Sequence, residues 1–387
     1  QFSQRCAGVW KQLSDHEKKA FIDLALHDKI RYLQEIESWE MKMMKSGHFD
    51  VLRRRSREIA MNSMKSTNQT VHDGQKAHKR NMSVVVGGGR GFIGKHLVSS
   101  LRNKFKVHII SRQPKQLNEI SWDSIKYDGL PSDCFAVVAL QGTTLLKPFR
   151  KFNQQVREEI YSSRIDTMRT LTSAISKMSN PSQVSVLVSM SGVGFYPPSV
   201  SMDYTESWTD KDNNESNKDF IRTLSIDWEE TSKPPNTTRH VILRLGLVLG
   251  KDGGLIKSLY PSFWFGFGST FSDGSQWFPW IHVDDVASLI VEAIISSSMK
   301  GIYNLVAPSD PITNAEFAKE FARSFSPSRP MILSTPKFAL NLMFGAELTN
   351  SVICSGLRVR SERITADLPD FRFKYSTIQE ACSSFHS

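Results

Sequence analysis

Residues 84–94 read VVVGGGRGFIG, and the organisation of the remaining chain follows from this stretch. Three β-branched residues, a glycine cluster and an amphipathic run predict a strand, a tight turn and a helix. Gly88, Gly91 and Gly94 stand at the G-x-x-G-x-x-G spacing. A helix N-terminus presents unpaired N–H groups to a pyrophosphate, and glycine lets the backbone approach it closely. The stretch therefore predicts a dinucleotide site, with an ordinary glycine-rich turn as the alternative.

The end of the next predicted strand indicates which dinucleotide is bound. This strand, residues 106–110, ends about 20 residues beyond the turn, where an NAD site carries Asp or Glu for the ribose 2′-hydroxyl. Ser111 and Arg112 stand there instead. Because a hydroxyl and a guanidinium suit a 2′-phosphate, we predict NADP rather than NAD. The alternative is a solvent-exposed arginine with no ligand.

Further strand-then-helix units follow the first one. Buried-strand runs recur at residues 134–142, 184–191 and 240–250. Such alternation predicts an α/β fold, a Rossmann-like doubly wound parallel sheet. Residues 251–280 and 308–387 interrupt the alternation. We expect them to form a smaller C-terminal substrate lobe that closes over the nicotinamide end of the cofactor.

Candidate site residues stand at the ends of these strands. Ligands lie over the carboxyl ends of parallel strands, so Leu140 and Gln141 should flank the cofactor. Ser191 ends the next strand, where its hydroxyl can bond a substrate oxygen or simply cap a turn. Glu159 and Arg164 lie on the intervening helix, either as site residues or as solvated charges.

No metal site is predicted. The stretch PWIHVDDVA, residues 279–287, is typical of a helix capped by its aspartates, Asp284 and Asp285, beside a packed His282. The cysteines are far apart and form no C-x-x-C pair, which indicates neither zinc nor a disulfide framework and favours a reducing compartment: Cys6, Cys134, Cys354 and Cys382.

Length and composition fit an α/β domain with an appendage. The chain has 387 residues, 40% of them hydrophobic, and a net charge of +10. No apolar run approaches the roughly 18–20 residues that span a bilayer, so no membrane partner is expected. The chain opens with Gln, so we expect its natural start to lie upstream. Mitochondrial and cytoplasmic locations both stay open, as does the oligomeric state.

The basic charge concentrates near the N-terminus. Residues 1–80 hold 16 Lys/Arg against 10 Asp/Glu, which suggests a separate appendage with a polyanionic partner, or alternatively a solvated basic helix. Ser14 and Glu17 form a capping box, and apolar residues from Phe21 to Trp39 then recur at helical spacing. Residues 60–82 lack such a period and read as a linker.

Residues 1–59 resemble a partial HMG box, particularly the second box of the mitochondrial transcription factor A type. The matching text is WKQLSDHEKKAF at residues 10–21 and DKIRYLQEIESWE at residues 28–40, followed by a basic tail. The resemblance implies an α-helical segment that contacts DNA from the minor groove. The first helix of the box has no counterpart here. A remnant without DNA binding is therefore the alternative, because two helices bury little surface.

Residues 83–383 resemble the atypical extended short-chain dehydrogenases/reductases, specifically the epimerase family 39U type. The ordered matches are GGGRGFIG at residues 87–94, SR at 163–164, DWE at 227–229, VILRLGLVLG at 241–250, FPWIHVDD at 278–285 and APSDPITNAEF at 307–317. The resemblance implies an NADP-dependent oxidoreductase. The cofactor contacts that it implies are Gly88, Arg90, Gly91, Phe92, Ile93, Gly94, Ser111, Arg112, Leu140, Gln141, Glu159, Arg164 and Val248.

Two departures from the family pattern lie near the cofactor. The family's threonine in the glycine turn is Arg90 here, which we expect to add positive charge beside the pyrophosphate. The family's A-G-E after the strand at residues 134–139 is Q-G-T here, beginning at Gln141, so an amide side chain stands where the family has alanine.

The catalytic pattern departs further. Ordinary short-chain reductases use Tyr-x-x-x-Lys for proton transfer, and the corresponding places hold Ile221 and Ser225. Ser191 matches the assisting serine of the family, and Tyr196 and Tyr204 are candidate proton donors by proximity in sequence. We therefore expect an NADP-dependent oxidoreductase whose substrate the sequence does not identify. The alternative is a catalytically silent NADP(H)-binding module, with DNA binding by the N-terminal segment.

Overall fold

The computed structural model describes residues 82–178, 183–209, 219–325 and 331–386. The predicted HMG-box segment, residues 1–59, and nearly all of the predicted linker, residues 60–82, lie outside the described residues. Within the described residues, no helix combines the length and apolar character needed to cross a membrane.

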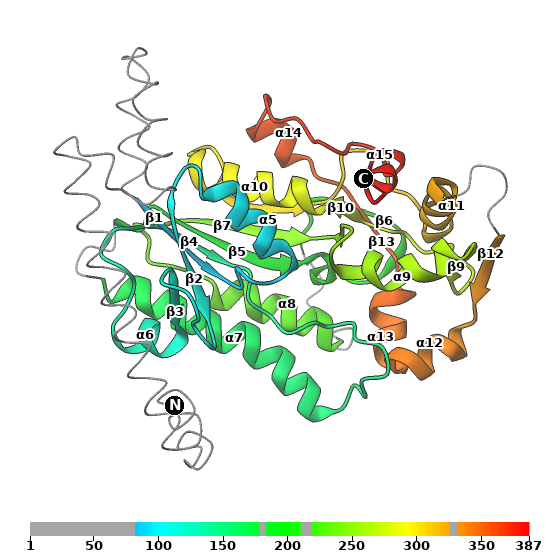
Figure 1. The fold of residues 1–387 in the computed structure, drawn as a ribbon, viewed down its shortest axis with the longest axis horizontal. Coiled ribbons are helices and arrows are strands. Elements are labelled where there is room, and N and C mark those ends of the chain that lie inside the picture. Colours follow the sequence, from blue (N-terminus) through cyan, green and yellow to red (C-terminus); the bar gives the residue numbers. More distant parts are fainter. Residues whose placement is uncertain (1–81, 179–182, 210–218, 326–330, 387) are drawn as a thin grey trace, which may run out of the picture. The chain divides into compact units, whose positions relative to one another are not determined.

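A seven-stranded parallel sheet forms the centre of the fold (Figure 1). Its strand order is β11-β7-β5-β4-β1-β2-β3. Successive strands are added toward one edge from β1 to β3 and toward the other edge from β4 to β11, so the order of addition reverses between β1 and β4. All six neighbouring pairs are parallel. In order along the sheet the strands are Gly301–Leu305, Arg239–Leu245, Val186–Gly192, Cys134–Ala139, Ser83–Gly87, Lys106–Ser111 and Glu119–Ser121. The predicted Rossmann-like doubly wound sheet is confirmed.

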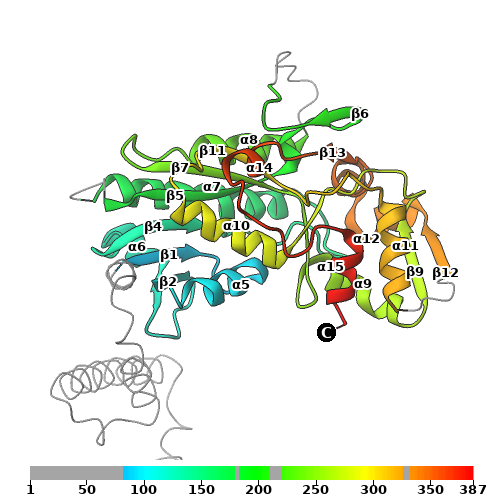
Figure 2. The same cartoon turned by 90° about the horizontal axis from the view of Figure 1, so that it is seen from above.

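Helices cover both faces of this sheet, which explains why its central strands read as continuous apolar runs. Helices α5 (Phe92–Leu101) and α10 (Val283–Ile295) lie on one face (Figure 2). Helices α6 (Trp122–Tyr127), α7 (Gln154–Ser176) and α8 (Phe220–Thr231) lie on the other. β1 is buried along its whole length between these layers.

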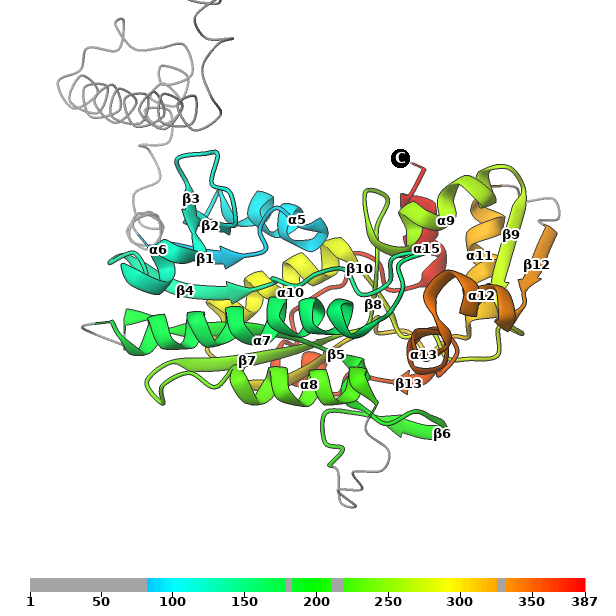
Figure 3. The same cartoon turned by 90° about the horizontal axis from the view of Figure 1, so that it is seen from below.

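A smaller lobe lies beyond the carboxyl edge of the sheet (Figure 3). Aromatic side chains build its core, and Phe278 stacks on Phe317 at 4.3 Å between ring centroids. Its elements are α9 (Gly254–Trp264), β9 (Phe267–Phe271), α11 (Asn314–Phe325), β12 (Met331–Thr335), α12 (Lys337–Phe344), α13 (Ala346–Leu348), η4 (Thr349–Ile353) and α15 (Ile378–Ser384). β9 and β12 pair in parallel.

Short elements connect the sheet and the lobe. β8 (Leu247–Leu249) pairs with β10 (Trp280–His282), and β6 (Ser199–Tyr204) pairs with β13 (Leu357–Val359). The remaining elements are η2 (Val193–Phe195) and α14 (Arg363–Asp367).

Candidate functional site

The glycine turn between β1 and α5 is shaped by close backbone contacts. Gly88 has φ +77°, and a Cβ there would lie 2.7 Å from the Leu140 carbonyl group. A Cβ on Gly94 would lie 2.2 Å from the Gly88 carbonyl oxygen. Gly91 caps α5 and offers no side-chain acceptor to the first-turn N–H groups. The turn therefore presents a helix N-terminus as a site for an anion.

Gln141 lies over this turn with its amide group unpaired. It is buried, and neither Nε2 nor Oε1 has a hydrogen-bond partner among the described residues. A Cβ on Gly87 would lie 2.4 Å from the Gln141 Oε1. Leaving a buried amide unpaired costs about 1–3 kcal/mol, so this arrangement suits a bound polar ligand.

The end of β2 carries the two residues that indicate NADP. Ile110 pairs with Gly87, so Ser111 and Arg112 follow at the same edge of the sheet as the glycine turn. The Ser111 hydroxyl accepts a hydrogen bond from the Gln113 N–H at 3.2 Å. Arg112 is exposed, and its guanidinium has no partner within the described part of the chain. It is free to contact a phosphate at this edge.

Arg90 has a partner that the sequence did not indicate. Its guanidinium forms a bidentate ion pair with Glu119 at the start of β3, with Nε 2.7 Å from Oε1, and its expected place beside the pyrophosphate stays a prediction. The charge of Arg90 is therefore offset by a carboxylate. Sequence reasoning missed Glu119 because no spacing pattern links residues on different elements, here 29 positions apart.

Arg164 lies against the loop that follows β4. Its Nη1 and Nη2 donate to the carbonyl oxygens of Ile160 and Thr143, both at 3.1 Å, and its guanidinium stacks 5.2 Å from the Trp228 ring. Burial lowers its pKa to about 10. A Cβ on Gly142 would lie 3.0 Å from the Arg164 Cζ, so Arg164 supports the segment beside Gln141.

The other implied cofactor contacts are spread around the turn. Phe92 packs its ring against the loop after β8, where a Cβ on Gly253 would lie 2.3 Å from a ring carbon. Ile93 and Val248 are partly buried against the main core. Glu159 is half exposed on α7 and forms an ion pair with Arg150.

Ser191 lies at the carboxyl end of β5 and is 2% exposed. Its hydroxyl has no hydrogen-bond partner among the described residues. Ile221 and Ser225 on α8 face the turn that follows: a Cβ on Gly194 would lie 2.7 Å from an Ile221 methyl group. The Ser225 hydroxyl already donates to the Ile221 carbonyl oxygen at 2.9 Å. The places of the usual tyrosine and lysine thus hold no ionisable group.

The candidate proton donors Tyr196 and Tyr204 are each 1% exposed. The Tyr196 hydroxyl donates to the Asn304 Oδ1 at 2.8 Å and accepts from the Arg244 Nη1 at 3.0 Å. The Tyr204 hydroxyl donates to the Pro197 carbonyl oxygen at 2.7 Å. Burial raises the pKa of both tyrosines. Either one would have to break these hydrogen bonds to reach a substrate.

Comparison with known proteins gives the family. Residues 84–305 match the NAD dependent epimerase/dehydratase family. The chain belongs to this family. Residues 335–385 match a separate domain of unknown function, DUF1731, in the smaller lobe.

Similar epimerase family proteins occur in animals and plants. The chain is 39% identical over 268 residues to the epimerase family protein SDR39U1 of Bos taurus. This alignment covers 69% of this chain and 87% of that protein. The chain is 32% identical over 313 residues to a chloroplastic SDR39U1 homolog of Arabidopsis thaliana, covering 78% and 85%. A crystal structure of human SDR39U1 (isoform 2) with NADPH superposes with a TM-score of 0.72 at 33% identity, covering 79% of this chain and 99% of that one.

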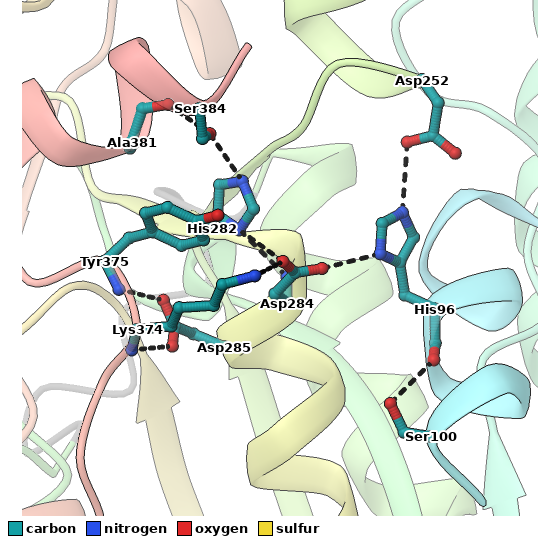
Figure 4. Close-up of polar contacts among 10 residues, drawn as sticks. All are labelled: His96, Ser100, Asp252, His282, Asp284, Asp285, Lys374, Tyr375, Ala381 and Ser384. Atoms are coloured by element: carbon teal, nitrogen blue, oxygen red, sulfur yellow. Dashed lines mark hydrogen bonds and ion pairs between the residues drawn. The ribbon is translucent and has the colours of Figure 1, made fainter. Parts of the chain in front are cut away.

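A polar cluster joins the epimerase-family sheet to the C-terminal segment (Figure 4). His96 on α5 lies between two carboxylates, with Nδ1 2.8 Å from Asp284 Oδ1 and Nε2 3.2 Å from Asp252 Oδ1. Lys374 donates from Nζ to Asp284 Oδ2 at 2.8 Å. The helix that begins at the glycine turn is thereby fixed to the lobe.

The capping prediction at the start of α10 was wrong in its residues. His282 is the N-cap, and its Nδ1 accepts from the Asp284 N–H at 3.1 Å. Asp285 instead accepts from the backbone N–H groups of Lys374 and Tyr375 at 2.6 and 3.1 Å. The aspartates do not cap the helix because they lie inside its first turn, after Val283, and their carboxylates bind neighbouring elements.

Proposed function

We propose that this chain is an NADP(H)-dependent oxidoreductase of the epimerase type. The observation that carries the proposal is the buried Gln141 amide beside the glycine turn, which has no hydrogen-bond partner in the described part of the chain. A turn in which a Cβ at Gly88 or Gly94 would clash with the backbone, a helix N-terminus without a side-chain cap and an exposed Arg112 guanidinium without a partner among the described residues complete a set of groups suited to a phosphorylated dinucleotide. The NADPH in the human SDR39U1 structure supports the same choice.

The residues divide into three roles toward the cofactor. The α5 N-terminus and its glycines would hold the pyrophosphate. Ser111 and Arg112 would hold the 2′-phosphate, and Gln141 would donate to or accept from the cofactor. When bound, NADP(H) supplies the hydride that is exchanged with the substrate. Ser191 has a buried hydroxyl that no described residue hydrogen-bonds, and it would position the reacting oxygen of a carbonyl or alcohol.

A second candidate is a catalytically silent NADP(H)-binding module. It is supported by the apolar Ile221 and the internally bonded Ser225 at the places of the usual tyrosine and lysine. Turnover distinguishes the two candidates, whereas cofactor binding does not.

The experiment combines binding and turnover. NADPH fluorescence titration should show saturable binding, and a panel of aldehydes and ketones should oxidise the bound NADPH. Ser191→Ala should lower turnover by about 100-fold, as loss of a hydrogen bond to a reacting oxygen does, with little change in NADPH affinity. Ser225→Ala, whose hydroxyl is already satisfied, is the matched control. Binding with no turnover across the panel would favour the silent module; no binding would remove both candidates.

DNA binding by residues 1–59 remains a proposal from the sequence, supported by their basic surplus and their HMG-like text. It is tested by fluorescence anisotropy of a labelled duplex with the full chain. Affinity should fall steeply with salt, and replacing Arg53, Arg54 and Arg55 by Gln should reduce the salt slope by about 0.9 for each phosphate that is no longer neutralised. No binding at low salt would remove this proposal.

A further inference from the structure

Arg90 links the glycine turn to an element beyond the second strand. It stands between β1 and α5, and its bidentate partner Glu119 begins β3, the edge strand beyond β2. The Arg90 side chain is 42% exposed, whereas that of Glu119 is 1% exposed. The Arg90–Glu119 ion pair therefore spans the end of β2, and the Arg90 side chain covers the buried Glu119 carboxylate.

Glu119 also holds the loop that follows β2. Its Oε2 accepts from the backbone N–H groups of Lys115 and Gln116, the latter at 3.1 Å. Burial acts to raise the pKa of Glu119, but these N–H groups and Arg90 hold it below its ordinary value, so the side chain is a carboxylate at neutral pH. Glu119 thus ties the loop, residues 112–118, to Arg90, whereas the glycine turn itself is shaped by backbone contacts of Gly88 and Gly94.

The two arginines near the glycine turn differ in whether they have a counter-charge. Arg90 and Glu119 offset one another. Arg112, at the start of the same loop, is exposed and has no partner within the described ranges. Lys115, in the same loop, is likewise exposed and forms no ion pair within the described ranges, so Arg112 is the cation without a counter-charge that stands directly after β2.

We infer that the Arg90–Glu119 pair is a positioning device that sets the preference for NADP over NAD. It holds loop 112–118, and with it Arg112, at a fixed place relative to the glycine turn. The inference rests on the proposed NADP(H) binding. NADH lacks the 2′-phosphate, so its affinity depends on the glycine turn but not on where Arg112 is held. A direct contact of Arg90 with the pyrophosphate would instead affect both nucleotides equally.

The test uses the full chain with Arg90→Ala, Arg90→Lys and Glu119→Gln. Dissociation constants for NADPH and NADH come from nicotinamide fluorescence, and hydrogen exchange of residues 112–118 is followed without nucleotide. Arg90→Ala and Glu119→Gln should each weaken NADPH binding by about tenfold and leave NADH binding within about twofold. Arg90→Lys, which keeps one ion-pair contact, should recover part of the affinity. Exchange in the loop should rise in the two disruptive variants.

The outcomes separate this inference from the proposed function. A wild-type chain that binds neither nucleotide overturns the proposed function and the preference with it. A wild-type chain that prefers NADPH, together with variants that lose both nucleotides equally or neither, overturns the positioning role alone. Tighter NADPH binding by Glu119→Gln would also overturn it, because it would show that Glu119 competes with phosphate for Arg90.

Discussion

Arg244 on β7 and Glu229 on α8 form a buried bidentate ion pair, with Nε and Nη2 donating to the two carboxylate oxygens at 2.7 and 2.8 Å. Their side chains are 2% and 10% exposed. Burial acts to lower the pKa of Arg244, but Glu229 and Tyr196 raise it above its ordinary value. Because Arg244 is the strand partner of Ser191, this pair supports the sheet beside the proposed catalytic serine.

Removing one member of this pair should destabilise the fold strongly. Glu229→Gln leaves the buried Arg244 guanidinium without a counter-charge, so we expect the free energy of unfolding to fall by about 3–5 kcal/mol. Urea denaturation followed by circular dichroism measures the change. The matched control is Glu230→Gln, which breaks the exposed pair with Lys233 and should cost less than about 1 kcal/mol. Equal midpoints for the two variants would show that the buried pair contributes little.

Mild acid should destabilise the protein through His240. Burial lowers its pKa from 6.5 to about 4. Between these values the unfolded chain binds a proton that the folded chain does not, so stability falls as pH falls, by up to about 1.4 kcal/mol per pH unit. His240→Gln can keep the hydrogen bond to the Ser189 hydroxyl and should flatten the profile in this window.

The comparison with wild type separates the effect of His240 from that of two other groups, His282 and Asp285, whose pKa shifts act in the same pH range. Burial also lowers the pKa of His282 to about 4, which acts in the same direction. Burial raises the pKa of Asp285 to about 6, which acts in the opposite direction as pH falls. Both are present in each protein. Parallel stability profiles for wild type and His240→Gln would contradict the assignment.

Gly88→Ala should weaken cofactor binding strongly. The new Cβ would be 2.7 Å from the Leu140 carbonyl group, and φ +77° is strained for alanine, so the turn must move. We expect NADPH affinity to fall by more than about tenfold, measured by fluorescence titration. Gly129→Ala is the control, because Gly129 has φ +89° but open space around its Cβ position. It should lose stability through strain yet bind NADPH normally; an equal decrease in affinity for both variants would mean that strain alone is responsible.

The sequence predicted the parts of the fold that depend on local pattern. Val84 to Val86 are fully buried in β1 because both sheet faces are covered, and this produces the continuous apolar run that identified a parallel strand. Ser191 was expected at the carboxyl end of its strand for the same reason, and it lies there, at the end of β5; its role toward a substrate stays a prediction.

What the sequence could not predict depends on contacts between distant residues. Glu119 appeared as an ordinary charge, and only the folded chain shows that it is buried against Arg90. The pairing of Glu229 with Arg244 likewise joins a helix and a strand without a spacing pattern. Tyr196 and Tyr204 were chosen by nearness to Ser191 in sequence, which carries no information about where their hydroxyl groups are bonded.

Arg112→Ala should lower the affinity for NADPH but not the affinity for NADH. The side chain is exposed and unpaired within the described residues, so its removal should leave the free energy of unfolding within about 0.5 kcal/mol of wild type. Without a charge-assisted hydrogen bond to the 2′-phosphate, NADPH binding should weaken by about 1–3 kcal/mol, or roughly 5- to 150-fold, while NADH binding stays unchanged. Arg102→Ala removes an exposed cation at the far end of α5 and controls for the general decrease in positive charge. If wild type binds both nucleotides equally, or if Arg112→Ala weakens both alike, the guanidinium at the end of β2 does not select the phosphorylated cofactor.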